Sequence, residues 1–316
     1  MFKIISILSL IFAFAAVDLA IFFCFTWIVL PPSSDSVRAK SIEVEAYLPF
    51  KNDSMIIKRK DNSMEIIGDK PVIDCATALY PVASSFVYSL YDESDVSIEG
   101  NNFKDESKLQ LNNTLGAYKR IVDGTSDIGL LAKPSQDQLD YAASKGVDLI
   151  LEPIGYEAFV FLVNEKNPIT SLTIDQVKGI YTGKYRNWKE FCDFNKTITP
   201  IQRAKNSGSQ TAFLNFMKED KDNLISKPFI NFGSPIGYSF RFYVEDVIKN
   251  GKVKAIGLNG IQPTRENIAN KTYPVVSTVY AVYSSKNNNP NTKKVVDWIK
   301  SDFGQNILDD CGYVKL

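Results

Sequence analysis

Apolar and polar positions along the chain follow two periods, one typical of strands and one typical of helices. Short apolar runs predict strands at residues 71–73, 127–132, 155–163 and 198–201. Apolar residues three or four positions apart predict helices at residues 82–90, 114–122, 174–181, 209–218 and 292–308. Ile42, Val44 and Ala46 alternate with glutamates, which predicts a strand or an extended lead-in. The alternation of strands and helices predicts an α/β fold with mixed sheets, and its extent favours two lobes.

The N-terminal 30 residues have a different pattern from the rest of the chain. Residues 4–30 form an apolar run of 27 residues with one charge, Asp18, and a helix of about 20 apolar residues spans a bilayer. Trp27 lies near the end of the run, where interfacial anchors are common. Asp18 costs free energy inside a bilayer, and the pattern gives no reason for it. We predict a transmembrane signal anchor that holds the remaining chain on the extracytoplasmic side of the cell membrane.

Two other fates of this segment stay open. Residues 13–15 read Ala-Phe-Ala and resemble a signal-peptide cleavage site, although cleavage there would leave an exposed apolar N-terminus at residues 19–30. Cys24 suggests a lipid-anchored cysteine, but two bulky phenylalanines precede it. All three interpretations place the chain after this segment outside the cytoplasm. Residues 31–68 are then expected to form a tether and lead-in.

Composition excludes several kinds of chemistry. Lysine plus arginine and aspartate plus glutamate both number 36, so the net charge is zero, which disfavours a nucleic-acid partner. The chain has no histidine, so it can hold neither a histidine base nor a histidine-ligated metal. The four cysteines lack CxxC spacing, and free thiols are favoured over a bridge between Cys192 and Cys311. No catalytic group, cofactor motif or metal cluster is recognisable, which favours a binding protein over an enzyme.

Residues with hydroxyl or amide side chains precede three predicted helices, at 76–79, 112–114 and 203–211. The third segment combines Arg203, three hydroxyls and Gly208 within nine residues. Helix N-termini present unpaired N–H groups and the positive end of the helix dipole, which suit a small oxyanion. A single capping residue is ordinary, but the third segment has more donors than one cap requires. Asp127 begins a predicted strand and is expected to point into the same cleft.

From about Lys70 to Leu316, the chain resembles the phosphate-binding proteins of bacterial phosphate ABC transporters, which have the type II periplasmic-binding-protein-like fold. The residues that carry this resemblance occur in one order, at 74–81, 124–134, 152–156, 187–188, 203–211, 236–238, 263–268, 273–274 and 312–314. The resemblance implies two lobes with a ligand cleft between them. We expect residues 69–152 plus 276–316 in lobe one and 153–275 in lobe two, with crossovers near 151–155 and 273–278.

The resemblance also implies a set of phosphate ligands: Ala76, Thr77, Ala78, Leu79, Thr114, Asp127, Arg203, Ser207, Gly208 and Ser209. Thr77 is interpreted as a helix N-cap. Asp127 would accept the proton of phosphate, and because an ionised carboxylate only accepts, it would repel sulfate. The chain departs from the family at Cys75, where glycine is usual, and at Lys205, which replaces an acid that pairs with the arginine.

The implied function is binding of inorganic phosphate as the substrate-binding component of an ABC importer. Its partners would then be a membrane permease and an ATPase, with the lipid bilayer contacted through residues 4–30. The long anchor and Lys205 favour an alternative, a membrane-anchored phosphate sensor or interaction module that no longer serves import. Binding of another oxyanion, such as sulfate or molybdate, is disfavoured by Asp127.

Overall fold

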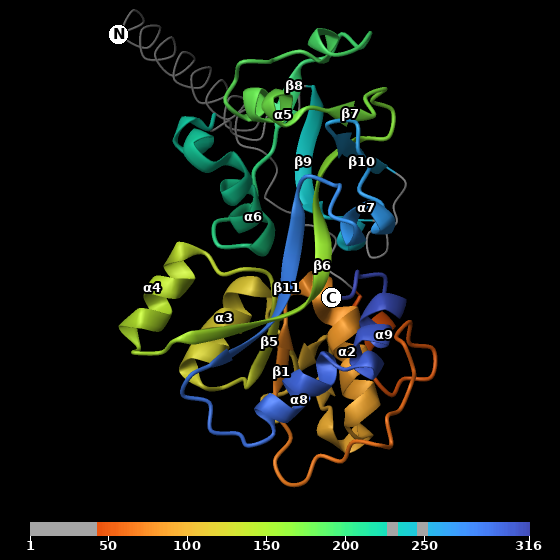
Figure 1. Cartoon of the computed structure of the whole chain (residues 1–316), viewed down its shortest axis with the longest axis vertical. Coiled ribbons are helices and arrows are strands. Elements are labelled where there is room, and N and C mark those ends of the chain that lie inside the picture. The colour runs from red at the N-terminus through yellow and green to blue at the C-terminus, as the bar shows by residue number, and fades with distance from the viewer. Residues whose placement is uncertain (1–42, 226–232, 245–251) are drawn as a thin grey trace, which may run out of the picture. The chain divides into compact units, whose positions relative to one another are not determined.

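The computed structural model of the protein, drawn in Figure 1, describes residues 43–225, 233–244 and 252–316. The anchor predicted at residues 4–30 lies outside the described residues, as does the tether up to residue 42. Within the described ranges, no helix is both long and apolar enough to cross a membrane.

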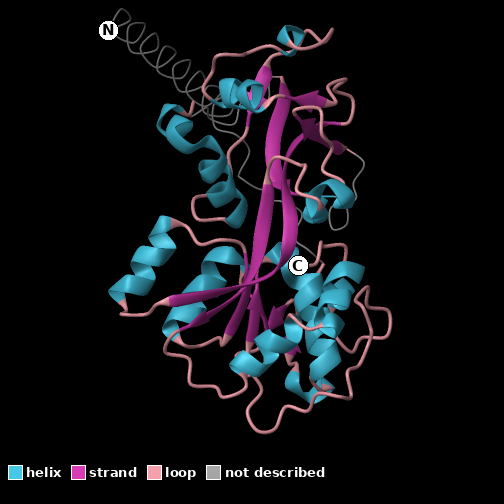
Figure 2. Cartoon of the chain, in the orientation of Figure 1, coloured by secondary structure: helices cyan, strands magenta, loops and turns pink. Residues whose placement is uncertain are grey.

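A mixed β-sheet runs through the described part of the chain (Figure 2). Neighbouring strands follow the order β4-β1-β5-β11-β6-β10-β7, and β9 pairs with both β6 and β8. The strands are β1 (Ile73–Cys75), β4 (Leu109–Leu111), β5 (Ile128–Leu131), β6 (Leu149–Asn164), β7 (Ser171–Leu172), β8 (Ile198–Pro200), β9 (Ser234–Phe240), β10 (Val253–Leu258) and β11 (Val276–Ser284). A separate ribbon joins β2 (Ile98–Glu99) to β3 (Asn102–Phe103). Because β1 is parallel to β5 and β11 is antiparallel to β5, the predicted α/β class with a mixed sheet is confirmed.

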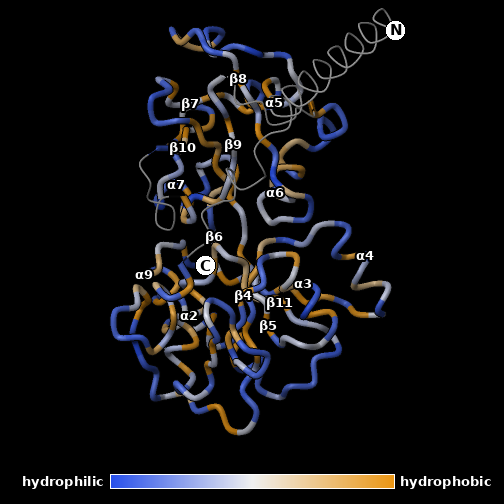
Figure 3. Tube along the Cα trace, turned by 180° about the vertical axis from the view of Figure 1, so that it is seen from behind, coloured by the Kyte–Doolittle hydropathy of each residue, from blue (hydrophilic) through white to orange (hydrophobic). Residues whose placement is uncertain are grey.

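Two large hydrophobic clusters form most of the core of the described residues. The first gathers around β1, β4 and β5, with α2 (Tyr80–Leu90), α8 (Thr292–Ile299) and α9 (Asp302–Asp310) on one side of these strands and α3 (Asn113–Asp123) on the other (Figure 1). The helix α4 (Gln136–Ser144) packs on α3 through a smaller cluster of Val122, Ala142 and Val147. The second joins the end of β6 to β8, β9, β10, α5 (Ile174–Tyr181), α6 (Gly208–Met217) and α7 (Arg265–Ala269). Hydrophobic stretches follow the central strands, and hydrophilic ones follow most connecting loops (Figure 3).

The long strand β6 belongs to both clusters. Residues 149–158 pair with β11, whereas residues 159–164 pair with β9 and β10. The pairing of β6 with β11 is irregular between Val279 and Tyr280. β6 therefore connects the first cluster directly to the second.

Residues 43–68 pack against the first cluster. The alternation near Val44 predicts a strand or an extended segment, but Val44–Tyr47 is a 3-10 helix in which Ala46 N donates to Glu43 O at 3.0 Å. The hydroxyl of Tyr80 donates to Val44 O at 3.0 Å, and Ile66 is only 8% exposed. A period-two pattern shows which side chains share a face, but it does not supply a neighbouring strand.

The helix predicted at 292–308 is divided into α8 and α9. Ser301 caps α9 by accepting a hydrogen bond from Gly304 N at 3.4 Å. A Cβ atom at Gly304 would lie 2.5 Å from Trp298 O, so glycine allows α9 to begin directly against the end of α8. By contrast, the helix predicted at 174–181 is confirmed and begins at a capping box, in which Gln176 N donates to Thr173 Oγ1 at 3.1 Å and Thr173 N to Gln176 Oε1 at 2.8 Å.

Candidate anion-binding site

The loops after β1, β4 and β5 share one edge of the sheet. These three strands are parallel, with Ile73 beside both Leu109 and Ile128, so their carboxyl ends lie together. The loops at this edge are residues 76–79, 112–114 and 132–135. Ligands of open α/β sheets bind beyond the carboxyl ends of the strands, which makes this edge the candidate site.

The first loop leads into a 3-10 helix, Thr77–Leu79. The N-cap is Ala76 rather than Thr77, and no side chain caps the helix, so the prediction for Thr77 is wrong in this detail. Two of the predicted donors are already used, since Ala76 N donates to Leu130 O at 3.1 Å and Leu79 N to Ala76 O at 2.8 Å. The N–H groups of Thr77 and Ala78 and the hydroxyl of Thr77 have no acceptor among the described residues. These are the groups that the first loop can offer to a ligand.

The carboxylate of Asp74, which the sequence pattern did not identify as a functional residue, holds this loop in place from the end of β1. Its side chain is fully buried and accepts hydrogen bonds from Cys75 N at 2.8 Å and from Asn112 N and Nδ2 at 3.2 and 2.9 Å. Arg120 Nε lies 3.3 Å from the same carboxylate. Burial raises the pKa of Asp74, while the hydrogen bonds from Asn112 and Cys75 act in the opposite direction. The carboxylate therefore ties the end of β1 to the start of α3.

At the start of α3, Asn113 takes the capping role. Its backbone has a positive φ of 54°, and its Oδ1 accepts from Leu115 N at 3.0 Å and Gly116 N at 3.1 Å. The neighbouring Thr114 is 9% exposed, and its hydroxyl has no hydrogen-bond partner in the described part of the chain. The Thr114 hydroxyl is thus available to a ligand at the predicted position.

The start of α6 meets this edge of the sheet. Ser207 caps α6 by accepting from Gln210 N at 3.2 Å, so its hydroxyl oxygen is partly engaged. A Cβ atom at Gly208 would lie 3.1 Å from Thr114 Oγ1 and 3.5 Å from Ala132 Cβ. Ser209 is 8% exposed, and the first N–H groups of α6 have no partner within the helix. The structure therefore brings the α3 and α6 starts together.

Arg203 approaches from the same segment as α6. Its backbone N–H donates to Gln210 Oε1 at 2.9 Å and to the Tyr238 hydroxyl at 3.1 Å, and the Tyr238 hydroxyl in turn donates to Gln210 Oε1. The guanidinium makes no ion pair with a described residue. Burial raises the pKa of Tyr243, and the nearby positive charge of Arg203 opposes that shift. The backbone of Arg203 is fixed, and its charged end is available to an anion.

Lys205 and Asn206 join the α6 segment to the start of α4. Lys205 Nζ lies 2.7 Å from Asp137 Oδ2, and Asn206 Nδ2 donates to the same oxygen at 3.0 Å. The hydroxyl of Ser135 donates to Asn206 Oδ1 at 3.1 Å. Asn206 has a positive φ of 65°, which a local turn requires. Lys205 is therefore directed to Asp137, so its positive charge is partly compensated.

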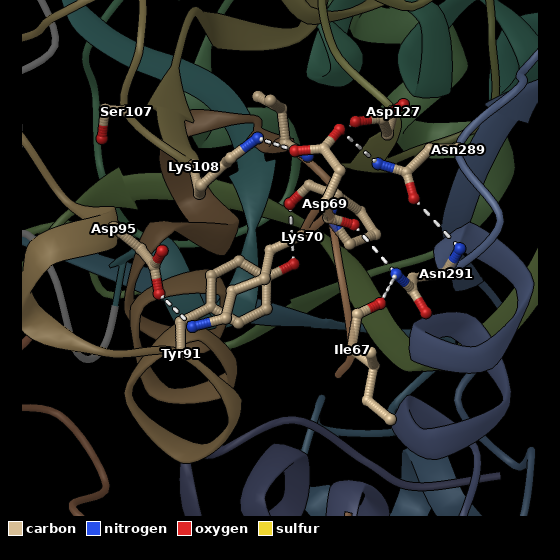
Figure 4. Close-up of polar contacts among 12 residues, drawn as sticks. Ile67, Asp69, Lys70, Tyr91, Asp95, Ser107, Lys108, Asp127, Asn289 and Asn291 are labelled. Carbon is tan, nitrogen blue, oxygen red and sulfur yellow. Dashed lines mark hydrogen bonds and ion pairs between the residues drawn. The ribbon is translucent and has the colours of Figure 1, made fainter. Parts of the chain in front are cut away.

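Asp127 lies at the opposite end of β5, and its predicted role needs correction. Its carboxylate accepts from Val72 N and from Asn287 Nδ2, both at 2.7 Å. Figure 4 shows Asp127 in the polar cluster that also contains Asp69, Lys108 and Asn289, beside the amino ends of the strands. The four residues of β5 separate Asp127 from Ala132, and the five residue steps between them span about 16 Å. This position disagrees with contact between Asp127 and an anion held by the helix starts.

The thiol of Cys75 also points away from the first loop. Cys75 is buried, and its Sγ donates to Gln110 O on β4 at 3.4 Å. Burial raises the pKa of this thiol well above its ordinary value. Cys75, Cys192 and Cys311 are all unpaired.

The strand order and the meeting of helix starts define a class, an α/β protein that presents backbone donors at one sheet edge. A family model described as a PBP superfamily domain matches residues 72–302. The chain belongs to the PBP superfamily.

Curated relatives include phosphate-binding proteins. The chain is 26% identical over 209 residues to the phosphate-binding protein PstS of Bacillus subtilis, which covers 62% of this chain and 67% of that protein. It is 24% identical over 229 residues to PstS of Borreliella burgdorferi, with 66% and 77% covered. The resemblance stated from the sequence is confirmed by these matches.

Solved structures show the same fold. One is described as a candidate phosphate ABC transporter substrate-binding protein with bound phosphate from Clostridium perfringens, with a TM-score of 0.60, 24% identity, and 77% of this chain and 98% of that chain covered. Another is an ABC-type phosphate transport receptor from Vibrio cholerae, with a TM-score of 0.53, 19% identity, and 78% and 100% covered.

Proposed function

We propose that the chain binds inorganic phosphate as the extracytoplasmic substrate-binding component of a phosphate ABC importer. The observation that carries the proposal is the meeting of the α3 and α6 starts beyond β1 and β5. Among the described residues, the donors on Thr77, Thr114 and Ser209 and the guanidinium of Arg203, in the segment that leads into α6, have no partner. The curated relatives named as phosphate-binding proteins support the choice of ligand.

Binding must replace the water around the anion with protein donors. An unpaired polar group in a dry site costs about 1–3 kcal/mol, so the number of donors matters. The phosphate oxygens can be surrounded by the N–H groups of Thr77, Ala78 and Ser209 and by the hydroxyls of Thr77, Thr114 and Ser209. The Arg203 guanidinium can donate to two phosphate oxygens at once. A hydroxyl both donates and accepts, so Thr77, Thr114 or Ser209 can also receive the proton of phosphate. This takes over the role first assigned to Asp127.

Anion binding is proposed to close the two lobes, residues 69–152 plus 276–316 and residues 153–275, about β6 and β11. The passage of β6 from one hydrophobic cluster into the other supports this division. Because both lobes contribute donors, the ligand would stabilise the closed arrangement relative to the open one.

The importer role requires a membrane permease and an ATPase as partners, and a location outside the cytoplasm. The apolar run at residues 4–30 supports a membrane anchor that keeps the binding domain near such a permease. Extraction of cell membranes at alkaline pH tests the anchor. Release of the full chain into the soluble fraction would contradict it.

Titration calorimetry on the purified full-length chain tests the binding proposal. Phosphate should bind with micromolar affinity, and Arg203→Gln should weaken it about tenfold or more, because a hydrogen bond to a charged group contributes about 1.5–3 kcal/mol. Arg186→Gln is the matched control, since Arg186 is also exposed but donates to Gly183 O, away from the helix starts. Absence of heat at millimolar phosphate would refute the proposal.

A further inference from the structure

The C-terminal segment, residues 309–314, contacts the first loop of the candidate anion site. The hydroxyl of Tyr313 donates to Ala78 O, in the short 3-10 helix of that loop, at 2.7 Å. Tyr313 is buried, and the centre of its ring lies 4.7 Å from that of Phe242. Burial raises the pKa of Tyr313, and the negative charge of Glu157 acts in the same direction. The hydroxyl therefore stays protonated and remains a donor to the loop.

This hydrogen bond acts on a peptide unit that shapes the loop. Ala78 O and Leu79 N belong to one planar peptide unit and point in opposite directions. Leu79 N donates to Ala76 O at 2.8 Å, so the turn holds one side of this plane and the Tyr313 hydroxyl holds the other. A plane fixed on both sides restricts the backbone of Thr77 and Ala78. The N–H groups of these two residues are the ones that the first loop can offer to an anion.

Two arginines of the predicted lobe two contact the same C-terminal segment. Arg241 Nη2 donates to Gly312 O at 2.6 Å. Arg265, the first residue of α7, donates through Nη2 to Asp309 O at 3.0 Å and to Tyr313 O at 3.1 Å. Tyr313 is therefore bonded to lobe two through its carbonyl group and to the first anion loop through its hydroxyl group.

The two arginines differ in how deeply they are built into the fold. Arg241 is buried, and its Nε lies 3.4 Å from Glu157 Oε1 on β6. Glu157 Oε2 also accepts from Phe242 N at 3.2 Å. Removal of one partner from a buried ion pair is strongly destabilising, so substitution of Arg241 would disturb the whole fold. The Arg265 side chain is 47% exposed and can be replaced with less effect on the core.

We infer that Tyr313 is a positioning residue for anion binding, which holds the N–H groups of Thr77 and Ala78 in their ligand-binding orientation, and that Arg265 connects it to lobe two. This inference rests on the proposed function, because it uses the same anion site. Without the Tyr313 hydroxyl, the loop can reorient in the ligand-free protein. Binding must then order the loop again, and the cost of that ordering lowers the affinity.

Titration calorimetry with inorganic phosphate on full-length Tyr313→Phe and Tyr91→Phe tests the inference. Tyr91 is the matched control, because it is also buried and its hydroxyl donates to Pro71 O at 2.7 Å, before the amino end of β1. Each substitution removes one neutral hydrogen bond, so both should lower the midpoint of unfolding in urea. Only Tyr313→Phe should weaken phosphate binding, by about two- to tenfold.

Hydrogen exchange in the ligand-free protein gives a readout that a purely structural role would not change. The Leu79 amide hydrogen should exchange faster in Tyr313→Phe than in Tyr91→Phe, because only the first substitution releases the turn in which this amide is bonded. Equal phosphate affinities and equal Leu79 exchange rates in the two variants would overturn the inference and leave the proposed function intact. Absence of phosphate binding by the unsubstituted chain would instead refute the proposed function.

Arg265→Gln tests the connection to lobe two, and it does so even if Tyr313→Phe does not fold. It should weaken phosphate binding by about two- to fivefold, because the segment that carries the Tyr313 hydroxyl is then held less firmly. Arg59→Gln is the matched control, since the Arg59 side chain is also 47% exposed and donates to Asp310 Oδ2 at 2.9 Å, but it does not contact the carbonyl of Tyr313. Equal phosphate affinities in Arg265→Gln and Arg59→Gln would overturn this connection.

Discussion

At Gly208, the addition of a single methyl group should change the affinity for phosphate without lowering the stability of the fold. It is the first residue of α6, and it has no backbone requirement for glycine, since its φ is not in the left-handed region. An added Cβ would lie 3.1 Å from Thr114 Oγ1, 3.5 Å from Ala132 Cβ and 3.7 Å from the ring of Phe240. The contact with Thr114 is closer than ordinary packing allows. Gly208→Ala therefore requires either the Thr114 side chain or the α3 and α6 starts to shift by a few tenths of an ångström.

Gly208→Ala should have opposite effects on two quantities, the free energy of unfolding and the affinity for phosphate. Replacing glycine by alanine at a compatible helix position stabilises a protein by about 0.4–1 kcal/mol through the unfolded chain. Overpacking at a closed contact costs about 1–3 kcal/mol, which corresponds to a loss of roughly 5- to 150-fold in affinity. That cost falls on the closed arrangement, because the contact joins elements of the two predicted lobes. Phosphate affinity should fall while the melting temperature of the ligand-free protein stays the same or rises.

Calorimetry with phosphate and thermal unfolding without ligand measure these two effects. Thr114→Ala removes the hydroxyl that a Cβ at residue 208 would meet. In a double-mutant cycle, the loss of phosphate affinity in the double variant should therefore be smaller than the sum of the losses in the two single variants. Thr114 is itself a proposed ligand, and the cycle separates that role from the steric one. Unchanged phosphate affinity in Gly208→Ala would refute the reasoning that the contact between residue 208 and Thr114 limits binding.

Asp127→Asn should leave the affinities for phosphate and sulfate unchanged in calorimetry and should lower the free energy of unfolding by about 1 kcal/mol in urea, since one hydrogen bond at the amino ends of the strands is lost. Hydrogen bonds from Lys205, more than from any other group, hold the pKa of Asp137 below its ordinary value. The stability that the Lys205–Asp137 ion pair contributes is therefore fully present above the unfolded-state pKa of Asp137, and it is lost as pH falls through the lower folded-state pKa. In an NMR titration, Lys205→Gln should move the Asp137 midpoint upward, and an unmoved midpoint would exclude the ion pair. Burial raises the pKa of the Cys311 thiol to about 12, so alkylation of the native protein at mildly alkaline pH should modify Cys192 before Cys311 in peptide mass spectrometry. The reverse order would contradict the enclosure of Cys311.

The position of Asp127 shows what resemblance and what geometry each contributed. The residue pattern and the resemblance both identified the helix starts at Thr77, Thr114 and Ser209, which the structure gathers at or near one sheet edge. Both also assigned Asp127 to the site, although this residue precedes its strand. The rule that ligands bind beyond the carboxyl ends of strands would have excluded it, because the residue after β5 is Ala132. The signal against Asp127 was present in the sequence, but neither the pattern nor the resemblance took it into account.

Other features could not be read from local pattern. Asp74 reaches Asn112 across 38 positions, and Lys205 reaches Asp137 across 68, so both contacts depend on how distant segments pack. The division between α8 and α9 depends on Ser301 and Gly304, whereas the apolar period continues through both helices. Periodicity identified the buried face of this segment, but the cap determined where one helix ended and the next began.

The energetics of the site favour closure over net charge as the main determinant of affinity. The chain has no excess charge, and Lys205, the cation nearest in sequence to Arg203 on its C-terminal side, is paired with Asp137. A single exposed helix start contributes about 0.3–1 kcal/mol toward an anion, whereas micromolar binding requires about 8 kcal/mol. Three such starts and one arginine approach that value only when they act together in a site from which water is excluded, because dry surroundings strengthen each interaction. Substitutions that keep α6 away from α3 should therefore weaken binding about as much as removal of Arg203, even though they delete no group that touches the anion.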